Sequence, residues 1–200
     1  MAVLRNRRSD EIDPFSDLLF NTLLIFVMLF AIAIVAMNPK AKTGVIDAKA
    51  EFIVTVTWPD MNPNDIDTWV QDPGRNLVWF RQREGGMMHL DRDDRGLAND
   101  TLVVNGQQVV NPLNQEVVTV RGFSPGEYTV NVFYYDSKNG EPVPVNVSVV
   151  KVNPRAEVVF YGTVNLVRKG DEVTAVRFTV NRDGKVEAVN TLAKTLVERI

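Results

Sequence analysis

The chain has 200 residues, a formal net charge of −3 and no cysteine. The slightly negative charge gives no reason to expect nucleic-acid binding, and the lack of cysteine excludes disulfides, thiolate metal sites and cysteine nucleophiles. His89 is the single histidine, so a histidine-rich metal site is excluded and a Ser-His-Asp hydrolase would depend on that residue.

A long apolar stretch near the N-terminus predicts one transmembrane helix. Residues 18–37 carry no formal charge, and only Asn21 and Thr22 among them are polar. At about 1.5 Å per residue, a helix over this stretch spans about 30 Å, the thickness of the hydrocarbon core of a bilayer. The pair Asp13-Pro14 is typical of an N-cap and a first helical residue, and Asn38-Pro39 predicts the end of the helix.

These signals predict an N-terminal segment over residues 1–13, a transmembrane helix over 14–38 and a linker over 39–50. The positive charges around the helix are balanced, so they do not set its orientation by themselves. They are Arg5, Arg7 and Arg8 before the helix and Lys40, Lys42 and Lys49 after it. We favour a cytoplasmic N-terminus, because a long C-terminal domain is translocated largely regardless of charge.

From Glu51 onward the apolar pattern changes to a period of two, which is typical of strands with one face on a core. Apolar residues alternate in the ranges 52–58, 128–134, 143–149 and 176–180. Between such runs lie turn signals, namely Asp72-Pro73-Gly74, Gly85-Gly86, Asn105-Gly106, Ser124-Pro125-Gly126, Asn139-Gly140 and Arg182-Asp183-Gly184. We therefore expect an all-β, immunoglobulin-like sandwich over residues 51–190.

Two local patterns refine this expectation. The sequence Pro125-Gly126-Glu127-Tyr128 at the start of a long strand is similar to the tyrosine corner of immunoglobulin-like folds, in which a Tyr hydroxyl ties the start of the strand to nearby backbone. In the C-terminal tail, residues 191–200, Leu192, Leu196 and Ile200 have helical spacing. Together with Val189, they predict a short amphipathic helix.

Asp17 is an ionisable residue near the N-terminal end of the predicted transmembrane helix. Helical spacing places it on one face with Asn21, Leu24 and Met28, which indicates that this face meets protein or water. In the alternative interpretation, Asp17 marks the membrane boundary, where the positive end of the helix dipole favours an acid. Asn21 is either a second polar contact on an ion path, a helix–helix hydrogen bond or a packing residue.

The sequence Pro14-Phe15-Ser16-Asp17, followed by a long apolar run that ends at a proline, resembles the ExbD/TolR/MotB family. These proteins are single-pass subunits of ion-driven membrane motors, and the resemblance covers roughly residues 1–45. It implies that Asp17 carries the coupling ion, H⁺ or Na⁺, with no other cofactor. It also implies a homodimer inside a pentameric ring of a polytopic partner of the MotA/TolQ/ExbB type, in a bacterial inner membrane.

The C-terminal part departs from that family, whose exported domains are mixed α/β folds. About residues 50–150 resemble instead the YfaP-type β-sandwich family of exported bacterial proteins. The segments that carry this resemblance run from Asp65 to Gly74, from Gly85 to Asp91 and from Pro125 to Tyr135. That family supports a fold and an exported, periplasmic location, but it does not define an activity or the envelope partner.

Acidic residues in the sandwich raise a calcium hypothesis, which turn-forming Asx side chains would also explain; they are Asp65, Asp67, Asp91, Asp93 and Asp94. A linear calcium loop starting at Asp91 would place Leu102 where a bidentate Glu should stand, so no metal ligand is expected. The aromatic residues Trp58, Trp69, Trp79, Tyr134 and Tyr135 are interpreted as core residues, with a ligand platform as the alternative.

The sequence offers no catalytic constellation, so we do not expect an enzyme. The first hypothesis is the inner, dimeric subunit of a rotary motor driven by the proton or sodium motive force, which delivers work through the exported sandwich. The second is a passive, membrane-anchored immunoglobulin-like adhesion or scaffold module.

Overall fold

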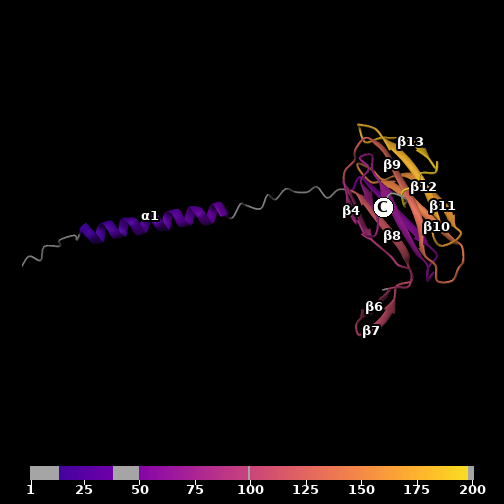
Figure 1. The fold of residues 1–200 in the computed structure, drawn as a ribbon, viewed down its shortest axis with the longest axis horizontal. Coiled ribbons are helices and arrows are strands. Elements are labelled where there is room, and N and C mark those ends of the chain that lie inside the picture. Colours follow the sequence, from indigo (N-terminus) through magenta and orange to yellow (C-terminus); the bar gives the residue numbers. More distant parts are fainter. Residues whose placement is uncertain (1–13, 38–49, 99, 198–200) are drawn as a thin grey trace, which may run out of the picture. The chain divides into compact units, whose positions relative to one another are not determined.

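The computed structural model describes residues 14–37, 50–98 and 100–197. Internal contacts divide the chain into two units, Met1–Asp47 and Ala48–Ile200. The first contains helix α1 (Pro14–Met37), and the second contains every described strand (Figure 1). The predicted segment 1–13, most of the linker 39–50, the helix end at Asn38-Pro39 and the flanking arginines and lysines lie outside the described residues.

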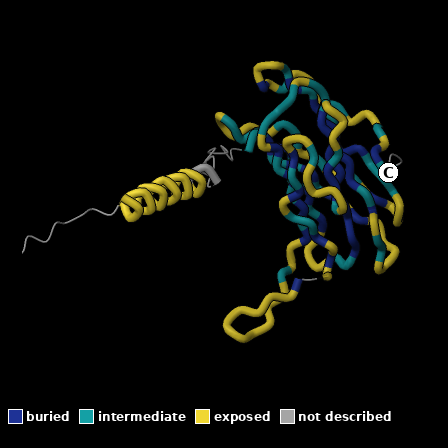
Figure 2. The backbone as a smooth tube through the Cα atoms, turned by 60° about the vertical axis from the view of Figure 1, so that its left-hand side comes forward, coloured by how far each residue is buried: buried dark blue, intermediate teal, exposed yellow. Residues whose placement is uncertain are grey.

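Helix α1 is 24 residues long, and Asp17 is its one ionisable residue. The helix is long and apolar enough to cross a membrane, as its sequence predicts. Its side chains from Pro14 to Ile34 are all exposed (Figure 2). A contiguous apolar surface of this size requires lipid or another protein around it.

The second unit is a sandwich of two antiparallel sheets, which confirms the predicted fold class. The six-stranded sheet contains, in spatial order, β11 (Glu157–Leu166), β10 (Val143–Lys151), β1 (Phe52–Trp58), β8 (Asn114–Val120), β5 (Met88–Arg92) and β4 (Glu84–Gly85). The five-stranded sheet contains β13 (Val186–Asn190), β12 (Glu172–Val180), β9 (Gly126–Asp136), β2 (Asp65–Gln71) and β3 (Leu77–Val78). The predicted turns fall at connections between consecutive strands, and two of their residues, Gly85 and Gly126, belong to β4 and β9 themselves.

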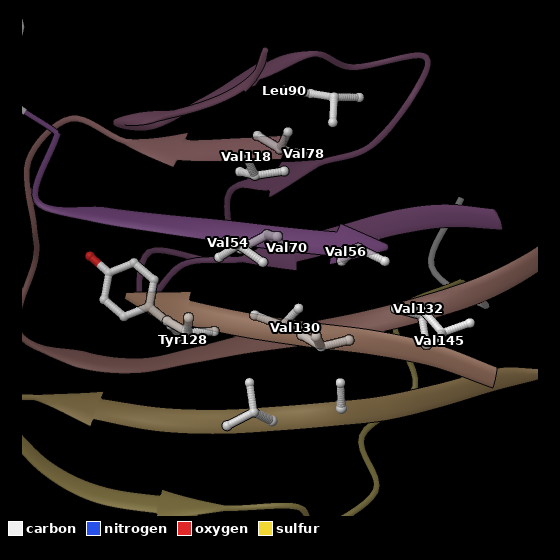
Figure 3. Packing of buried hydrophobic residues seen from close by; sticks show 14 of the residues in the cluster. Val54, Val56, Val70, Val78, Leu90, Val118, Tyr128, Val130, Val132 and Val145 are labelled. Carbon is white, nitrogen blue, oxygen red and sulfur yellow. The ribbon is translucent and has the colours of Figure 1, made fainter. Parts of the chain in front are cut away.

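The core lies between the two sheets and is built mainly from valines (Figure 3). β1 and β10 each bury alternate residues, so their apolar period of two translates directly into one inward face. Branched side chains suit this layer because they pack closely on a pleated surface. Aromatic rings fill one end, where Tyr128 stacks on Phe178 at a centroid distance of 5.2 Å.

Tyr128 forms the predicted tyrosine corner. Its ring is buried beside Phe52, and its hydroxyl oxygen accepts a hydrogen bond of 2.9 Å from the backbone N–H of Ser124. This bond fixes the connection through Pro125 to the start of β9. The strand therefore enters the sheet with its alternate residues already directed to the core.

A hairpin of β6 (Thr101–Val104) and β7 (Gln107–Val110) projects away from both sheets (Figures 1 and 2). Asn105 and Gly106 at its tip have positive φ values of 54° and 79°, as the Asn-Gly signal predicts for a tight hairpin turn. All residues of both strands are exposed. The apolar ones are Leu102, Val103, Val104, Val109 and Val110.

The prediction of a helix in the C-terminal tail is wrong. Val189 belongs to strand β13, residues 191–196 have no helical structure, and Ile200 lies outside the described residues. Glu172 holds the tail in this form, since its Oε1 accepts hydrogen bonds from the backbone N–H groups of Leu196 at 2.7 Å and Val197 at 3.3 Å. These contacts with a neighbouring strand replace the hydrogen bonds that a helix would form within itself.

Candidate functional site

The first candidate site is the polar pair near the start of helix α1. Asn21 Nδ2 donates a hydrogen bond of 3.4 Å to Asp17 Oδ1, one helical turn away. The structure therefore brings together the two residues that the sequence selected on one face. Thr22 is satisfied within the helix, because its hydroxyl donates to the carbonyl oxygen of Leu18 at 2.8 Å. Of the two polar residues in the apolar stretch, Asn21 therefore contacts a side chain, whereas Thr22 contacts backbone.

The second candidate site is a cluster of three carboxylates in the sandwich, which we call the acidic cluster: Asp67, Asp93 and Glu116. Asp67 lies on β2 of the five-stranded sheet, whereas Glu116 lies on β8 of the six-stranded sheet. Asp93 follows directly after β5. One carboxylate oxygen from each residue lies within 4.8 Å of the others. The cluster thus joins the two sheets at the β2 side of the sandwich.

The edge of β2 explains why a glutamate is buried there. On its outer side β2 pairs with β3 only through Val70 and Gln71. Glu116 occupies the adjacent position in place of a strand, and its Oε2 accepts the backbone N–H of Thr68 at 2.6 Å. A buried N–H group without a partner would be costly, so the carboxylate replaces a missing ladder hydrogen bond.

Each residue of the acidic cluster has one buried oxygen without a hydrogen-bond partner in the described part of the chain. Asp67 is 2% exposed and Glu116 is 1% exposed, and neither Asp67 Oδ2, Asp93 Oδ1 nor Glu116 Oε1 accepts a hydrogen bond. In the described part of the chain, no Lys or Arg forms an ion pair with any of the three. Buried carboxylates without a counter-charge are strongly disfavoured as anions.

The pKa values of these groups follow from that environment. Burial, together with the charges of Asp65 and Asp93, raises the pKa of Asp67 to about 8. Burial and the neighbouring Asp67 raise the pKa of Glu116 well above its ordinary value. The adjacent Asp65 has its pKa raised to about 6 by burial and then by Asp93. A neutral group is therefore favoured unless a positive charge enters the site.

Asp93 reaches the acidic cluster because its loop packs closely on the segment before β2. Gly96 has a φ of +65°, and a Cβ atom there would lie 2.7 Å from the carbonyl oxygen of Pro63 and 2.8 Å from that of Asn64. A residue with a side chain would therefore meet backbone that cannot rotate away. Only glycine permits both this left-handed conformation and this close approach.

We expect Gly96→Ala to lower the free energy of unfolding by about 2–4 kcal/mol, because the cost of a left-handed alanine adds to that of the steric overlap. The matched control is Gly140→Ala, at a φ of +72° with no atom within 4 Å of the added Cβ. That variant should lose only about 1 kcal/mol. Urea unfolding of the full chain in detergent measures both values, and equal losses would contradict the close packing inferred for the loop.

The five acidic residues that the sequence pointed to lie at different places in the structure. Asp67 and Asp93 meet, with Asp65 beside them. Asp91 lies elsewhere, on β5, with Oδ1 at 2.9 Å from Nδ1 of His89. Asp94 has a structural role, since its Oδ2 accepts hydrogen bonds from Arg92 at 2.8 Å and from the backbone N–H of Gln115 at 3.1 Å.

The turn-forming explanation is wrong for three of these acids, because Asp65, Asp67 and Asp91 lie in strands. A calcium loop from Asp91 to Leu102, against which the sequence already argues, does not fit the structure either, because these two residues belong to β5 and β6. The carboxylates that do meet come from three separate parts of the chain.

Glu116 was missed by the sequence interpretation. Its signal is a charged residue at an inward position of an alternating strand, because Glu116, Val118 and Val120 share the buried face of β8. A carboxylate at such a position needs a specific partner. The sequence does not identify that partner, since Asp67 is 49 residues away along the chain and on the other sheet.

A surface cavity of ≈ 290 Å³ adjoins the acidic cluster and shares Asp93 with it. The other walls are strongly charged, and they include Asp94, Asp100, Arg92 and Arg95. Asp93 is half-buried. Asp93 thus belongs both to the cluster and to the wall of this cavity, whereas Asp67 and Glu116 are closed off from solvent.

The remaining selected residues form no catalytic arrangement in the described residues. His89 lies on β5 and contacts Asp91 and, at 3.5 Å, Glu84. Trp58 and Tyr134 belong to the core between the two sheets, as predicted, whereas Trp69 and Trp79 form a separate buried cluster. Trp69 stacks on Trp79 at 4.5 Å on the outer face of the five-stranded sheet, where Leu196 of the tail covers them. Tyr135 is 38% exposed.

No protein-family model, no curated protein and no solved structure matches this chain.

Proposed function

We propose that this protein is the inner, dimeric subunit of an ion-driven rotary membrane motor. The observation that carries the proposal is the Asp17–Asn21 pair in the apolar helix α1, where Asp17 is the one ionisable residue. An ionisable side chain in a membrane helix is costly unless it faces protein or an aqueous path, so it marks a functional position. Asp17 carries the coupling ion, H⁺ or Na⁺, and Asn21 is its polar neighbour.

The mechanism follows from the chemistry of a carboxylate between helices. Partial desolvation favours the neutral form of a carboxyl group, so it takes up an ion from one side and releases it to the other when its surroundings change. One charge that crosses the full membrane potential supplies about 2.3 kcal/mol per 100 mV. This free energy turns a surrounding ring relative to the α1 dimer. The ring is a pentameric, polytopic partner of the MotA/TolQ/ExbB type.

In this proposal the protein is a single-pass protein of the bacterial inner membrane, with a cytoplasmic N-terminus and a periplasmic sandwich. The exposed side chains of α1 support a helix that is enclosed by other membrane components. The sandwich delivers the mechanical work to a partner in the envelope. Its large valine core gives it the rigidity that force transmission requires.

The protruding hairpin supports a second candidate, a passively anchored adhesion or scaffold module. Five of its exposed residues are apolar, and exposed apolar strands are typical of surfaces that bind another protein. In this alternative Asp17 is a boundary residue, and the hairpin is the functional part.

Native mass spectrometry distinguishes the two candidates. The complex is extracted from its own membrane with a mild detergent and purified through a C-terminal tag on this chain. The motor proposal predicts five copies of a polytopic protein and two copies of this chain. Recovery of this chain alone, or with soluble partners only, would refute the motor proposal and favour the anchored module.

A further inference from the structure

We infer that the acidic cluster of Asp67, Asp93 and Glu116 binds a divalent cation, Ca²⁺, which links the two sheets of the sandwich. This inference is independent of the motor proposal, since it concerns the second unit of the chain. It rests on the short distances among the three carboxylates, on the burial of Asp67 and Glu116, and on one buried, unpartnered oxygen in each of the three residues.

The geometry is compatible with a calcium ion. Ca²⁺ binds carboxylate oxygens at about 2.3–2.6 Å. One oxygen from each of the three residues lies within 4.8 Å of the others. Three oxygens this close to one another can contact a single ion after small adjustments of the side chains.

The unpartnered oxygens point to a ligand of positive charge. Glu116 is only 1% exposed. Its Oε2 accepts a hydrogen bond from the backbone N–H of Thr68, whereas its Oε1 has no partner. Asp67 Oδ2 and Asp93 Oδ1 are in the same state. A protein that buried these groups only for packing would leave three acceptors unsatisfied, and native structures rarely do so.

The type of ligand follows from the donors. Carboxylate oxygens are hard ligands that prefer Ca²⁺ and Mg²⁺, and the chain has no cysteine to form a thiolate site for a softer metal. The donors lie on two strands and a loop, and this arrangement does not impose an octahedral coordination geometry on the metal. Such a set suits the flexible coordination of Ca²⁺ better than the strict geometry of Mg²⁺.

The effect of the ion is mechanical. It would connect β2 of one sheet with β8 of the other and with the Asp93 loop after β5. The edge of β2 that β3 leaves uncovered would then be fixed by an ionic link as well as by the Thr68–Glu116 hydrogen bond. Binding would therefore raise the free energy of unfolding of the sandwich, by an amount that grows with the logarithm of the ion concentration once this exceeds Kd.

The test uses the full chain in detergent micelles after treatment with EDTA and dialysis. Isothermal titration with CaCl₂ up to about 10 mM covers the weak affinities, roughly 10⁻⁴–10⁻³ M, of extracellular calcium modules. We expect one bound Ca²⁺ per chain. At 100 times Kd we expect a rise in Tm of roughly 5–10 °C.

Three variants assign the effect to the acidic cluster. Asp67→Asn and Asp93→Asn should each weaken calcium binding at least about tenfold. Loss of a residue that only supports a metal ligand typically lowers metal affinity about 10–100-fold, and loss of a direct ligand should lower it at least as much. In EDTA, Asp67→Asn should have the same Tm as the wild type or a higher one, because it replaces one of three neighbouring carboxylic acids with a neutral amide. Asp91→Asn is the matched control: Asp91 is exposed, contacts His89, and should leave calcium binding unchanged.

The outcomes are distinct. If titration with CaCl₂ produces no heat of binding and CaCl₂ does not shift the Tm, the carboxyl groups of the cluster bind protons instead of a metal, and the inference is overturned. Tighter binding of MgCl₂ than of CaCl₂ would overturn the assignment of calcium. Normal binding by Asp67→Asn would place the ion elsewhere. Since Asp93 lies in a loop, Asp93→Asn remains informative even if Asp67→Asn fails to fold.

Discussion

Asp17→Asn is expected to assemble with the same copy numbers as the wild type and to lose ion-driven activity entirely. The substitution preserves the size and polarity of the side chain, and an amide oxygen can accept the hydrogen bond that Asn21 now donates to Asp17 Oδ1 at 3.4 Å. The helix should therefore keep its structure. An amide cannot exchange a proton or neutralise a sodium ion, so the coupling step is removed.

The measurement is ion uptake by proteoliposomes that contain the purified complex, driven by an imposed membrane potential. Native mass spectrometry of the same sample checks that assembly is intact. Thr22→Val is the matched control, because Thr22 is polar, lies in the same part of α1 and donates only to the carbonyl of Leu18. It should transport ions at the wild-type rate. Uptake at that rate by Asp17→Asn would remove Asp17 from the ion path and leave it as a boundary residue.

Leu196→Ala should lower the free energy of unfolding by about 2–5 kcal/mol, the usual cost of truncating a fully buried leucine. Leu196 is 0% exposed and lies with Trp69 and Trp79 on the outer face of the five-stranded sheet. The truncation leaves a cavity beside the two stacked tryptophan rings. It also releases the tail, whose position depends on this contact and on Glu172.

Leu192→Ala provides the control for this prediction. Leu192 is 66% exposed and should change the free energy of unfolding by no more than about 0.5 kcal/mol. The two leucines are four residues apart, so in an amphipathic helix they would share one buried face and lose similar amounts. Urea unfolding of the full chain, with the midpoint as readout, separates the two cases. Equal losses of unfolding free energy in Leu196→Ala and Leu192→Ala would contradict the non-helical conformation of the tail.

The sequence by itself determined those elements whose pattern is local. The uninterrupted apolar stretch predicted helix α1, because only a helix satisfies backbone groups over such a length in lipid. Alternation predicted β1, β9, β10 and β12, and turn residues predicted the connections between them. The tyrosine corner was also predictable, since Ser124 and Tyr128 are only four residues apart. The Asp17–Asn21 pair followed from helical spacing alone.

The tertiary structure alone decided the features that depend on contacts between distant segments. The tail has leucines at helical spacing, but Glu172 and the tryptophan pair hold residues 191–196 in a non-helical form, because contacts with the sheet outweigh a weak local preference. The acidic cluster combines Asp67, Asp93 and Glu116 from two sheets and a loop. No spacing in the sequence brings these carboxylates together. They meet because the uncovered edge of β2 faces Glu116, and because Gly96 allows the Asp93 loop to approach within van der Waals contact of the segment before β2.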